Sequence, residues 1–182
     1  MNRLLALLAV LFALAAPACT NLLVGKKASK NGACFITYSA DSYGMYGRML
    51  HYPAGKHAPG TMRKIVDGDT HKPLGEIPEA PYTYNVVGNI NEYQVAITET
   101  TFGGREELWP KNPVGGIDYV SLMALGLQRA KTAREAIRVM TDLVARYGYA
   151  SEGESFSVAD PNEAWILEMI GKGDSAKGAV WV

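Results

Sequence analysis

The sequence predicts an α+β fold, in which strands and helices occupy separate parts of the chain. Three observations predict this class. Segments rich in β-branched and aromatic residues, separated by glycine-containing turns, fill residues 20–99. Two segments with helical spacing of apolar residues follow at 119–147, and strand-like patterns return from residue 155. With 182 residues, the chain has room for one domain rather than two.

The chain begins with the pattern of a secretory signal peptide. Arg3 provides a positive start, an almost unbroken apolar run covers residues 4–16, and small residues lead to a cleavage point after Ala18. The apolar run is too short for a stable membrane span, which needs about 20 residues. We therefore expect signal peptidase to remove a signal peptide at 1–18, and a mature domain at 19–182 to be exported to the periplasm or the cell exterior.

Cleavage after Ala18 makes Cys19 the first residue of the mature chain. An N-terminal cysteine offers a thiol that attacks as the thiolate and an α-amine, with an unperturbed pKa of about 7.7–8.0, that takes the proton. A second interpretation stays open, because a cysteine at the end of an apolar run also fits a lipoprotein signal. Acylation of the amine would make the chain a lipid-anchored exported binding domain with Cys19 as the attachment site. Against it, Ala16 and Pro17 differ from the branched apolar and small residues expected before a lipidated cysteine.

Charge and histidine content argue against two other classes of function. The chain has 18 basic and 18 acidic residues, and removal of Arg3 from the 18 leaves 17 basic groups. This balance does not indicate a nucleic-acid partner. His51 and His57 are six residues apart among prolines and glycines, and this spacing matches no zinc-binding pattern. We therefore expect no nucleic acid, no metal and no cofactor.

The chain has two cysteines, and a disulfide between Cys19 and Cys34 would block the expected nucleophile. An oxidising compartment would permit such a bond. Cys34 can instead serve as a small apolar residue at the start of a strand. We therefore expect both thiols to stay unpaired.

A β-hairpin is expected directly after Cys19. Residues 20–27 and 33–40 have strand character, and Asn31-Gly32 between them favours a tight turn. The hairpin places the second strand beside the nucleophile. Asp41, at the far end of that strand, is then expected near the α-amine of Cys19.

The middle of the chain predicts fewer regular elements. A long loop is expected at 43–60, because this stretch is rich in tyrosine, glycine, histidine and proline without a clear period. A short strand is expected at 61–66 and another connection at 68–81. A second hairpin is expected between 84–89 and 93–99, which both contain β-branched and aromatic residues.

Two helices are expected in the second half. Asp118 is a suitable N-cap for a helix over 119–130 with a largely apolar surface. Thr132 and Glu135 form a capping-box pattern before a second helix, and Gly148 ends it. The methionines of these helices are expected to be core residues. Strands are expected again at 155–159, 164–170 and 179–182.

Several short motifs along the mature chain resemble one known family. They are Ala18-Cys19-Thr20, Leu23 to Ser29, Asp41-Ser42, Asn91-Glu92, Thr98 to Gly104 and Ala159 to Trp165. In this order they resemble the secreted cysteine-type N-terminal-nucleophile dipeptidases, the PepD or secernin-like group, which is similar to penicillin V acylase and bile salt hydrolases. The resemblance covers essentially the whole mature chain.

The resemblance implies an α-β-β-α sandwich, the fold of N-terminal-nucleophile (Ntn) hydrolases, with Cys19 on its first strand. It implies hydrolysis of dipeptides through an acyl-enzyme thioester. Asp41 matches an aspartate that holds the nucleophile and its amine, and Thr101 falls where related acylases have an asparagine that helps to form the oxyanion hole. The arginine that often lies three residues before the aspartate is Tyr38 here.

Members of this family are much longer than this chain, whose last expected strand has no turn or cap after it. We therefore expect residues 19–182 to be the N-terminal part of an Ntn-hydrolase catalytic domain, with an incomplete sandwich. An Ntn acylase acting on a non-peptide amide stays open as a second activity, because the sequence does not identify the pocket residues. The sequence does not indicate an oligomeric state.

Overall fold

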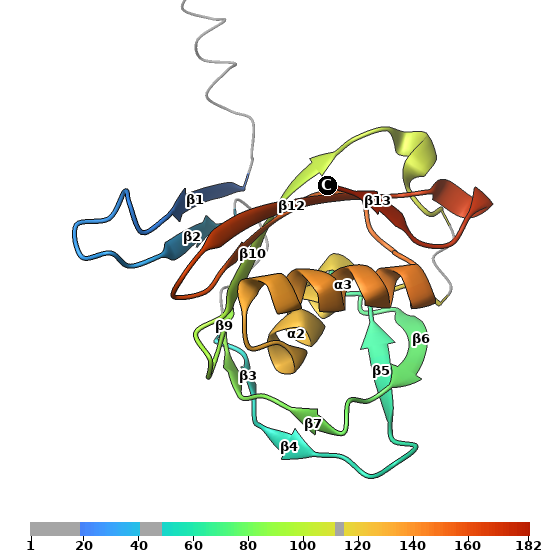
Figure 1. Cartoon of the computed structure of the whole chain (residues 1–182). Coiled ribbons are helices and arrows are strands. Elements are labelled where there is room, and N and C mark those ends of the chain that lie inside the picture. Colours follow the sequence, from blue (N-terminus) through green and yellow to red (C-terminus); the bar gives the residue numbers. More distant parts are fainter. Residues whose placement is uncertain (1–18, 41–48, 112–114) are drawn as a thin grey trace, which may run out of the picture.

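The computed structural model describes residues 19–40, 49–111 and 115–182, and it confirms the α+β class. A seven-stranded sheet has the order β13-β12-β11-β10-β9-β8-β3, and all its neighbouring strands are antiparallel (Figure 1). The strands predicted after residue 155 are confirmed as β11, β12 and β13. The seven strands are β3 (His51–Tyr52), β8 (Val86–Val87), β9 (Ile90–Asn91), β10 (Ala96–Gly103), β11 (Gly153–Ala159), β12 (Ala164–Gly171) and β13 (Ala179–Trp181).

Both predicted helices are present, and they cover one face of the sheet (Figure 1). Helix α2 (Tyr119–Arg129) begins after Asp118, whose carboxylate accepts a backbone N–H of the first turn at 3.3 Å. Helix α3 (Ala133–Tyr147) begins after Thr132, whose hydroxyl does the same at 3.2 Å, and ends at Gly148 with φ +99°. The three predicted cap residues are therefore confirmed, but the capping box is only half formed, because Glu135 Oε2 accepts the N–H of Lys131 at 2.9 Å and not that of Thr132. Among the described residues, no helix is both long and apolar enough to cross a membrane.

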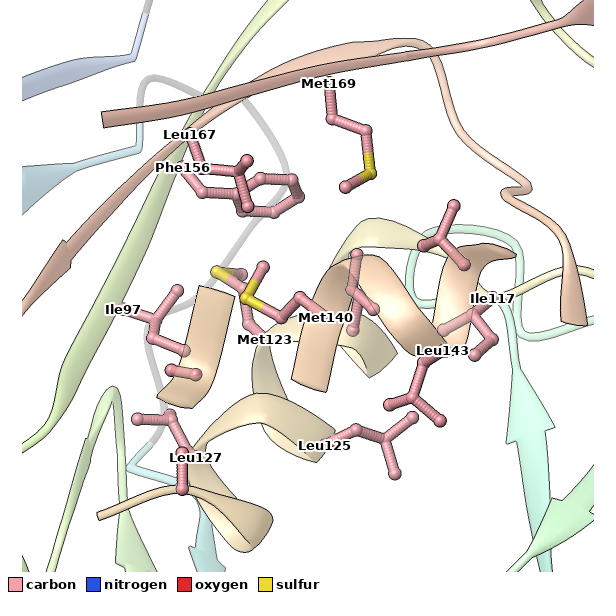
Figure 2. Close-up of a cluster of buried hydrophobic side chains, with 14 of the residues drawn as sticks. Ile97, Ile117, Met123, Leu125, Leu127, Met140, Leu143, Phe156, Leu167 and Met169 are labelled. Atoms are coloured by element: carbon pink, nitrogen blue, oxygen red, sulfur yellow. The ribbon is translucent and has the colours of Figure 1, made fainter. Parts of the chain in front are cut away.

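The hydrophobic core lies between the helices and the sheet (Figure 2). Phe156, Leu167 and Met169 extend from the sheet toward the helices, and all three are at most 1% exposed. Met140 of α3 is fully buried and Met123 of α2 is 7% exposed, which confirms that these methionines are core residues. Burial of each such side chain contributes roughly 1.5–3 kcal/mol to the free energy of unfolding.

The predicted N-terminal hairpin is present, with shorter strands than expected. Strand β1 (Thr20–Val24) pairs antiparallel with β2 (Phe35–Ser39), and the turn between them contains Gly32 at φ +74°. The hairpin is a separate two-stranded sheet that packs against β10, β11 and β12. The side-chain amide of Asn21 donates to the backbone carbonyl of Glu99 at 3.0 Å. The hairpin is thereby attached to the central sheet.

The expectation of an irregular connection at 68–81 was wrong. This stretch contains β6 (Pro73–Pro78), which pairs antiparallel with the predicted strand at 61–66, observed as β5 (Met62–Val66). The proline at each end of β6, which has no N–H to donate, hides the strand from sequence patterns. Burial of Leu74 and Ile77 in the core stabilises the strand despite its prolines.

The described part of the loop expected at 43–60 contains β3 and β4. Strand β4 (Gly55–Lys56) pairs with β7 (Tyr82–Thr83) in a further two-stranded sheet. His51 and His57 each hydrogen-bond a polar side chain of the facing segment, at 2.8 and 3.0 Å. The two histidines therefore help to attach this segment to its neighbour.

The second predicted hairpin has its turn elsewhere, at Gly88-Asn89 between β8 and β9. The buried side chain of Asn91 explains the difference. Its Oδ1 accepts two backbone N–H groups of the next loop at 3.0 Å each, and its Nδ2 donates to two carbonyls near the end of α2 at 2.8 and 2.7 Å. Strand β9 then pairs with β10 only between Ile90 and Ala96. Beyond Ile97, no other described strand of the sheet pairs with that edge of β10.

Two consecutive residues of β12 test the orientation of the sheet. Leu167 is 1% exposed and Ile166 is 57% exposed. We expect Leu167→Ala to lower the free energy of unfolding by about 2–5 kcal/mol, because it removes buried methyl groups and leaves a cavity. Ile166→Ala, the matched control, should change it by less than about 0.5 kcal/mol. Urea titrations of both variants measure the effect, and equal losses would contradict the observed strand orientation.

Candidate functional site

The predicted nucleophile lies at the head of the N-terminal hairpin. Cys19 immediately precedes β1 and is partly buried. Cys19 and Cys34 are both free thiols, as expected. The expected neighbour of the amine, Asp41, lies outside the described residues. The site is therefore built from Cys19 and from the described side chains that the hairpin approaches.

The hairpin register places Cys19 on the face that contacts β10. Asn21 is paired with Tyr38, and cross-strand partners point to the same side of a hairpin. Cys19 is two residues before Asn21, so the two-residue period of a strand gives it the same side. The Tyr38 hydroxyl donates to a carboxylate oxygen of Glu99, and Asn21 donates to the Glu99 carbonyl at 3.0 Å. Both contacts tie the Cys19 face to a single residue of β10.

A second carboxylate lies beside Glu99. Glu154 of β11 is 1% exposed and Glu99 is 3% exposed. The Thr101 hydroxyl lies between them, 2.9 and 3.0 Å from the two oxygens of Glu154 and 3.5 Å from Glu99 Oε2. Thr101, predicted as an oxyanion donor, therefore lies beside this carboxylate pair. Its hydroxyl proton can be donated to only one oxygen at a time.

Burial controls the protonation of this group of side chains. The pKa of Glu154 is raised to about 9, first because the carboxyl group is buried and next because of the charge of Glu99, although the hydrogen bond from Thr101 opposes the shift. The pKa of Tyr38 is raised above its usual range, mainly by burial and then by the hydrogen bond to Glu99. At neutral pH, Glu154 and Tyr38 thus keep their protons.

A cavity of about 290 Å³ opens beside these residues. Asp69, Trp109 and Tyr119 line it together with Thr101 and Glu154, and no lysine or arginine is among its described lining residues. The Tyr119 hydroxyl donates to Asp69 Oδ1 at 3.1 Å. The cavity is therefore polar, acidic and partly aromatic. It offers hydrogen-bond acceptors and donors to a small polar molecule.

Cys19 and Thr101 were predicted from the sequence, whereas the two buried glutamates were not. A usable signal was present in the strands. Glu99 follows Ile97 at the two-residue period of β10, and Glu154 precedes Phe156 in the same way on β11. A charged residue in register with core residues is a candidate for a functional site, because a buried carboxylate is costly unless it is paired.

Metal binding was not predicted for this chain. Among the described residues, no group of three or more histidine, cysteine, aspartate or glutamate side chains is arranged to hold a metal ion. Tyr38, which occupies the position of the family's arginine, donates a hydrogen bond and provides no positive charge. The described side chains around Cys19 offer a thiol, hydroxyl groups and carboxyl groups, which can take part in nucleophilic attack, hydrogen bonding and proton transfer.

Comparisons with known proteins place these features in a family context. The sequence model described as "Peptidase family C69" matches residues 47–182. A "probable dipeptidase" of Latilactobacillus sakei is 31% identical over 84% of this chain and 35% of its own length. A "dipeptidase" of Bifidobacterium longum is 28% identical over 85% of this chain and 33% of its own length. The chain thus spans about a third of the length of these relatives.

The raised pKa of Glu154 predicts how the free energy of unfolding depends on pH. The unfolded carboxyl group ionises near its usual pKa, whereas the folded one keeps its proton up to about pH 9. The folded state therefore binds more protons between about pH 4.5 and 9, so rising pH lowers the free energy of unfolding, by at most about 1.4 kcal/mol per pH unit. In the Glu154→Gln variant the side chain cannot ionise, so this pH-dependent fall in the free energy of unfolding should be absent.

Urea titrations at pH 5, 6, 7 and 8 measure the difference between the wild type and Glu154→Gln. The stability of the variant relative to the wild type should rise with pH. Glu168→Gln is the matched control, because Glu168 is exposed on the neighbouring strand. A constant difference between wild type and Glu154→Gln across this range would contradict a carboxyl group that keeps its proton in the folded state.

Proposed function

The chain belongs to peptidase family C69, and from this we propose that it is part of an exported cysteine dipeptidase with Cys19 as its nucleophile. One observation supports the assignment of the nucleophile. Asn21 and Tyr38, which lie on the same face of the hairpin as Cys19, are hydrogen-bonded to the buried Glu99. The proposal includes removal of residues 1–18 and the α-β-β-α sandwich. It also includes release of the mature protein to the periplasm or the cell exterior.

The proposed reaction begins at the two groups of Cys19. The α-amine takes the thiol proton, and the sulfur forms a bond to the carbonyl carbon of the peptide. The carbon–nitrogen bond then breaks, and the α-ammonium returns the proton to the leaving amino group. A thioester remains. Water attacks the thioester while the α-amine takes a proton from it, the carbon–sulfur bond breaks, and the proton returns to the thiolate.

Other residues are proposed to orient this reaction. Asp41 would hold the α-amine of Cys19, and Thr101 would contribute to stabilising the oxyanion of the tetrahedral intermediate. The Thr101 hydroxyl donates to Glu154 Oε1 at 2.9 Å, so its single proton would have to turn from that carboxyl group to the oxyanion. A donor in this place would act where negative charge develops in the reaction.

Dipeptides are the proposed substrates because similar proteins bear the names "dipeptidase" and "probable dipeptidase". The acidic cavity beside Thr101 agrees with this proposal, since a dipeptide has a free ammonium group. Two other functions are distinguishable by experiment. One is hydrolysis of a non-peptide amide by the same nucleophile, and the other is lipid anchoring of a binding domain at Cys19.

Cys19→Ser in the full-length protein tests the proposed nucleophile. We expect hydrolysis of dipeptides to fall by more than about a thousandfold, because the sulfur that forms the acyl-enzyme is lost. Cys34→Ser, the matched control, should retain activity, since the proposed reaction does not use Cys34. The released amino acids measure the rate, with a panel of non-peptide amides assayed in parallel. Undiminished hydrolysis by Cys19→Ser would refute the assignment.

The intact mass of the mature protein tests the N-terminus separately. A chain that begins with an unmodified Cys19 is expected. A diacylglyceryl group on that residue would instead support the lipid-anchored binding domain, because acylation of the amine removes the proposed base. A mature chain that begins at another residue would contradict the proposed catalyst.

A further inference from the structure

We infer that Asn21 and Tyr38 are positioning residues that hold the α-amine of Cys19 once residues 1–18 have been removed. The inference rests on the proposed function, because it requires Cys19 at the N-terminus. It assigns the amine two hydrogen-bond acceptors, the Asn21 Oδ1 and the Tyr38 hydroxyl oxygen. Both residues are anchored on Glu99.

Asn21 offers an acceptor that has no partner. Its Nδ2 donates to the Glu99 carbonyl at 3.0 Å and to Ser157 Oγ at 3.3 Å, and these contacts fix the orientation of the side-chain amide. Its Oδ1 is buried and has no hydrogen-bond partner within the described part of the chain. A buried acceptor without a donor costs free energy, so a donor that arrives there is stabilising. The acceptor lies two residues after the proposed N-terminus.

Tyr38 offers a second acceptor within reach of Cys19. Asn21 is paired with Tyr38, so Cys19 and Tyr38 are diagonal neighbours in the hairpin. Such neighbours have Cα atoms roughly 7–8 Å apart, and an aromatic side chain spans this distance. Cys19 also lies close enough to Tyr38 for a charge on its sulfur to help raise the pKa of the tyrosine, after burial and Glu99. Because the Tyr38 hydroxyl donates its proton to Glu99, its oxygen is left to accept a hydrogen bond.

The mature N-terminus has the donors that these two oxygens need. While Ala18 is attached, the Cys19 nitrogen is an uncharged peptide group with one N–H. After cleavage it becomes an amine with two N–H groups, or an ammonium with three. Two of these can bond Asn21 and Tyr38, and the charge of Glu99 behind Tyr38 favours the ammonium form. The amine is thereby held beside the thiol of its own residue.

The protonation of the amine depends on the groups around it. Among the described residues these are Tyr38 of β2, Glu99 of β10, Glu154 of β11 and Tyr119 of α2. Tyr38, Glu154 and Tyr119 keep their protons at neutral pH, because the pKa of each is raised. Among the described residues, the charge of Glu99 acts on Tyr38, and Asp41, which is proposed to hold the same amine, would add a second negative charge. Loss of the Glu99 charge, or of the Tyr38 oxygen, lowers the pKa of the amine.

The test uses Tyr38→Phe and Glu99→Gln in the mature full-length protein. The first removes the hydroxyl and keeps the ring, and the second removes the charge and keeps an acceptor for Tyr38. The α-amine is titrated by its reaction with an amine-selective acylating reagent between pH 5 and 10, followed by mass spectrometry of the N-terminal peptide. This measurement needs no hydrolytic activity.

We expect the pKa of the amine to fall by about one unit in each variant, a tenfold shift in its protonation equilibrium. The acidic limb of the pH profile of kcat/KM should move to lower pH by the same amount. A purely structural role for Tyr38 would lower activity without moving either titration. Tyr82→Phe is the matched control, because Tyr82 is 44% exposed and belongs to β7, outside the described site.

The outcomes separate this inference from the proposed function. An unchanged titration in both variants, with Cys19 at the N-terminus and dipeptides hydrolysed, would overturn the inference and leave the function intact. A mature chain that does not begin with a free Cys19 would overturn both. A lower pKa of the α-amine in Tyr38→Phe and Glu99→Gln, but not in Tyr82→Phe, would support the inference.

Discussion

The hydrogen bond between the Tyr38 hydroxyl and the carboxylate of Glu99 joins the N-terminal hairpin to the central sheet. Glu99 is almost fully buried and forms no salt bridge with a described lysine or arginine. A buried carboxylate is costly unless hydrogen bonds satisfy it, and here the hydroxyl groups of Tyr38 and Thr101 and the carboxyl group of Glu154 lie beside it. The position of Cys19 therefore depends on how this one carboxylate is satisfied.

The open edge of β10 makes this contact possible. Asn91 fixes the loop after β9, so β9 pairs with β10 only between Ile90 and Ala96. The Glu99 carbonyl is then available to Asn21 instead of to another strand. A polar side chain buried in a loop thus determines where the hairpin, and with it the proposed nucleophile, can attach.

The sequence was most informative where local chemistry decides the structure. Asp118, Thr132 and Gly148 cap helices through contacts within a few residues, and all three were predictable. Strand β6 was missed because its prolines obscure the pattern, while its stability comes from burying Leu74 and Ile77 against distant elements. Long-range contacts of this kind leave no local signal.

The same distinction between local signals and long-range contacts applies to the candidate site. Cys19 was recognisable because a signal-peptide pattern ends directly before it, and the family resemblance indicated Thr101. The pairing of Glu99 with Glu154 was not predictable, because 55 residues separate them and only the register of β10 and β11 brings them together. Tyr38 was noted only as a departure from the family's arginine. Its partner could be identified only from the structure.

The arrangement also indicates why the proposed removal of residues 1–18 and the assembly of the proposed site would belong together. With Ala18 attached, the Cys19 nitrogen has no charge and a single N–H, and the buried Asn21 Oδ1 has no partner among the described residues. After the proposed cleavage, the new amine would satisfy that acceptor and would gain a charge that Glu99 stabilises. The proposed cut would therefore create the base and also the donors that hold it. Both effects favour the same geometry, because a single nitrogen atom provides the catalytic group and the hydrogen bonds.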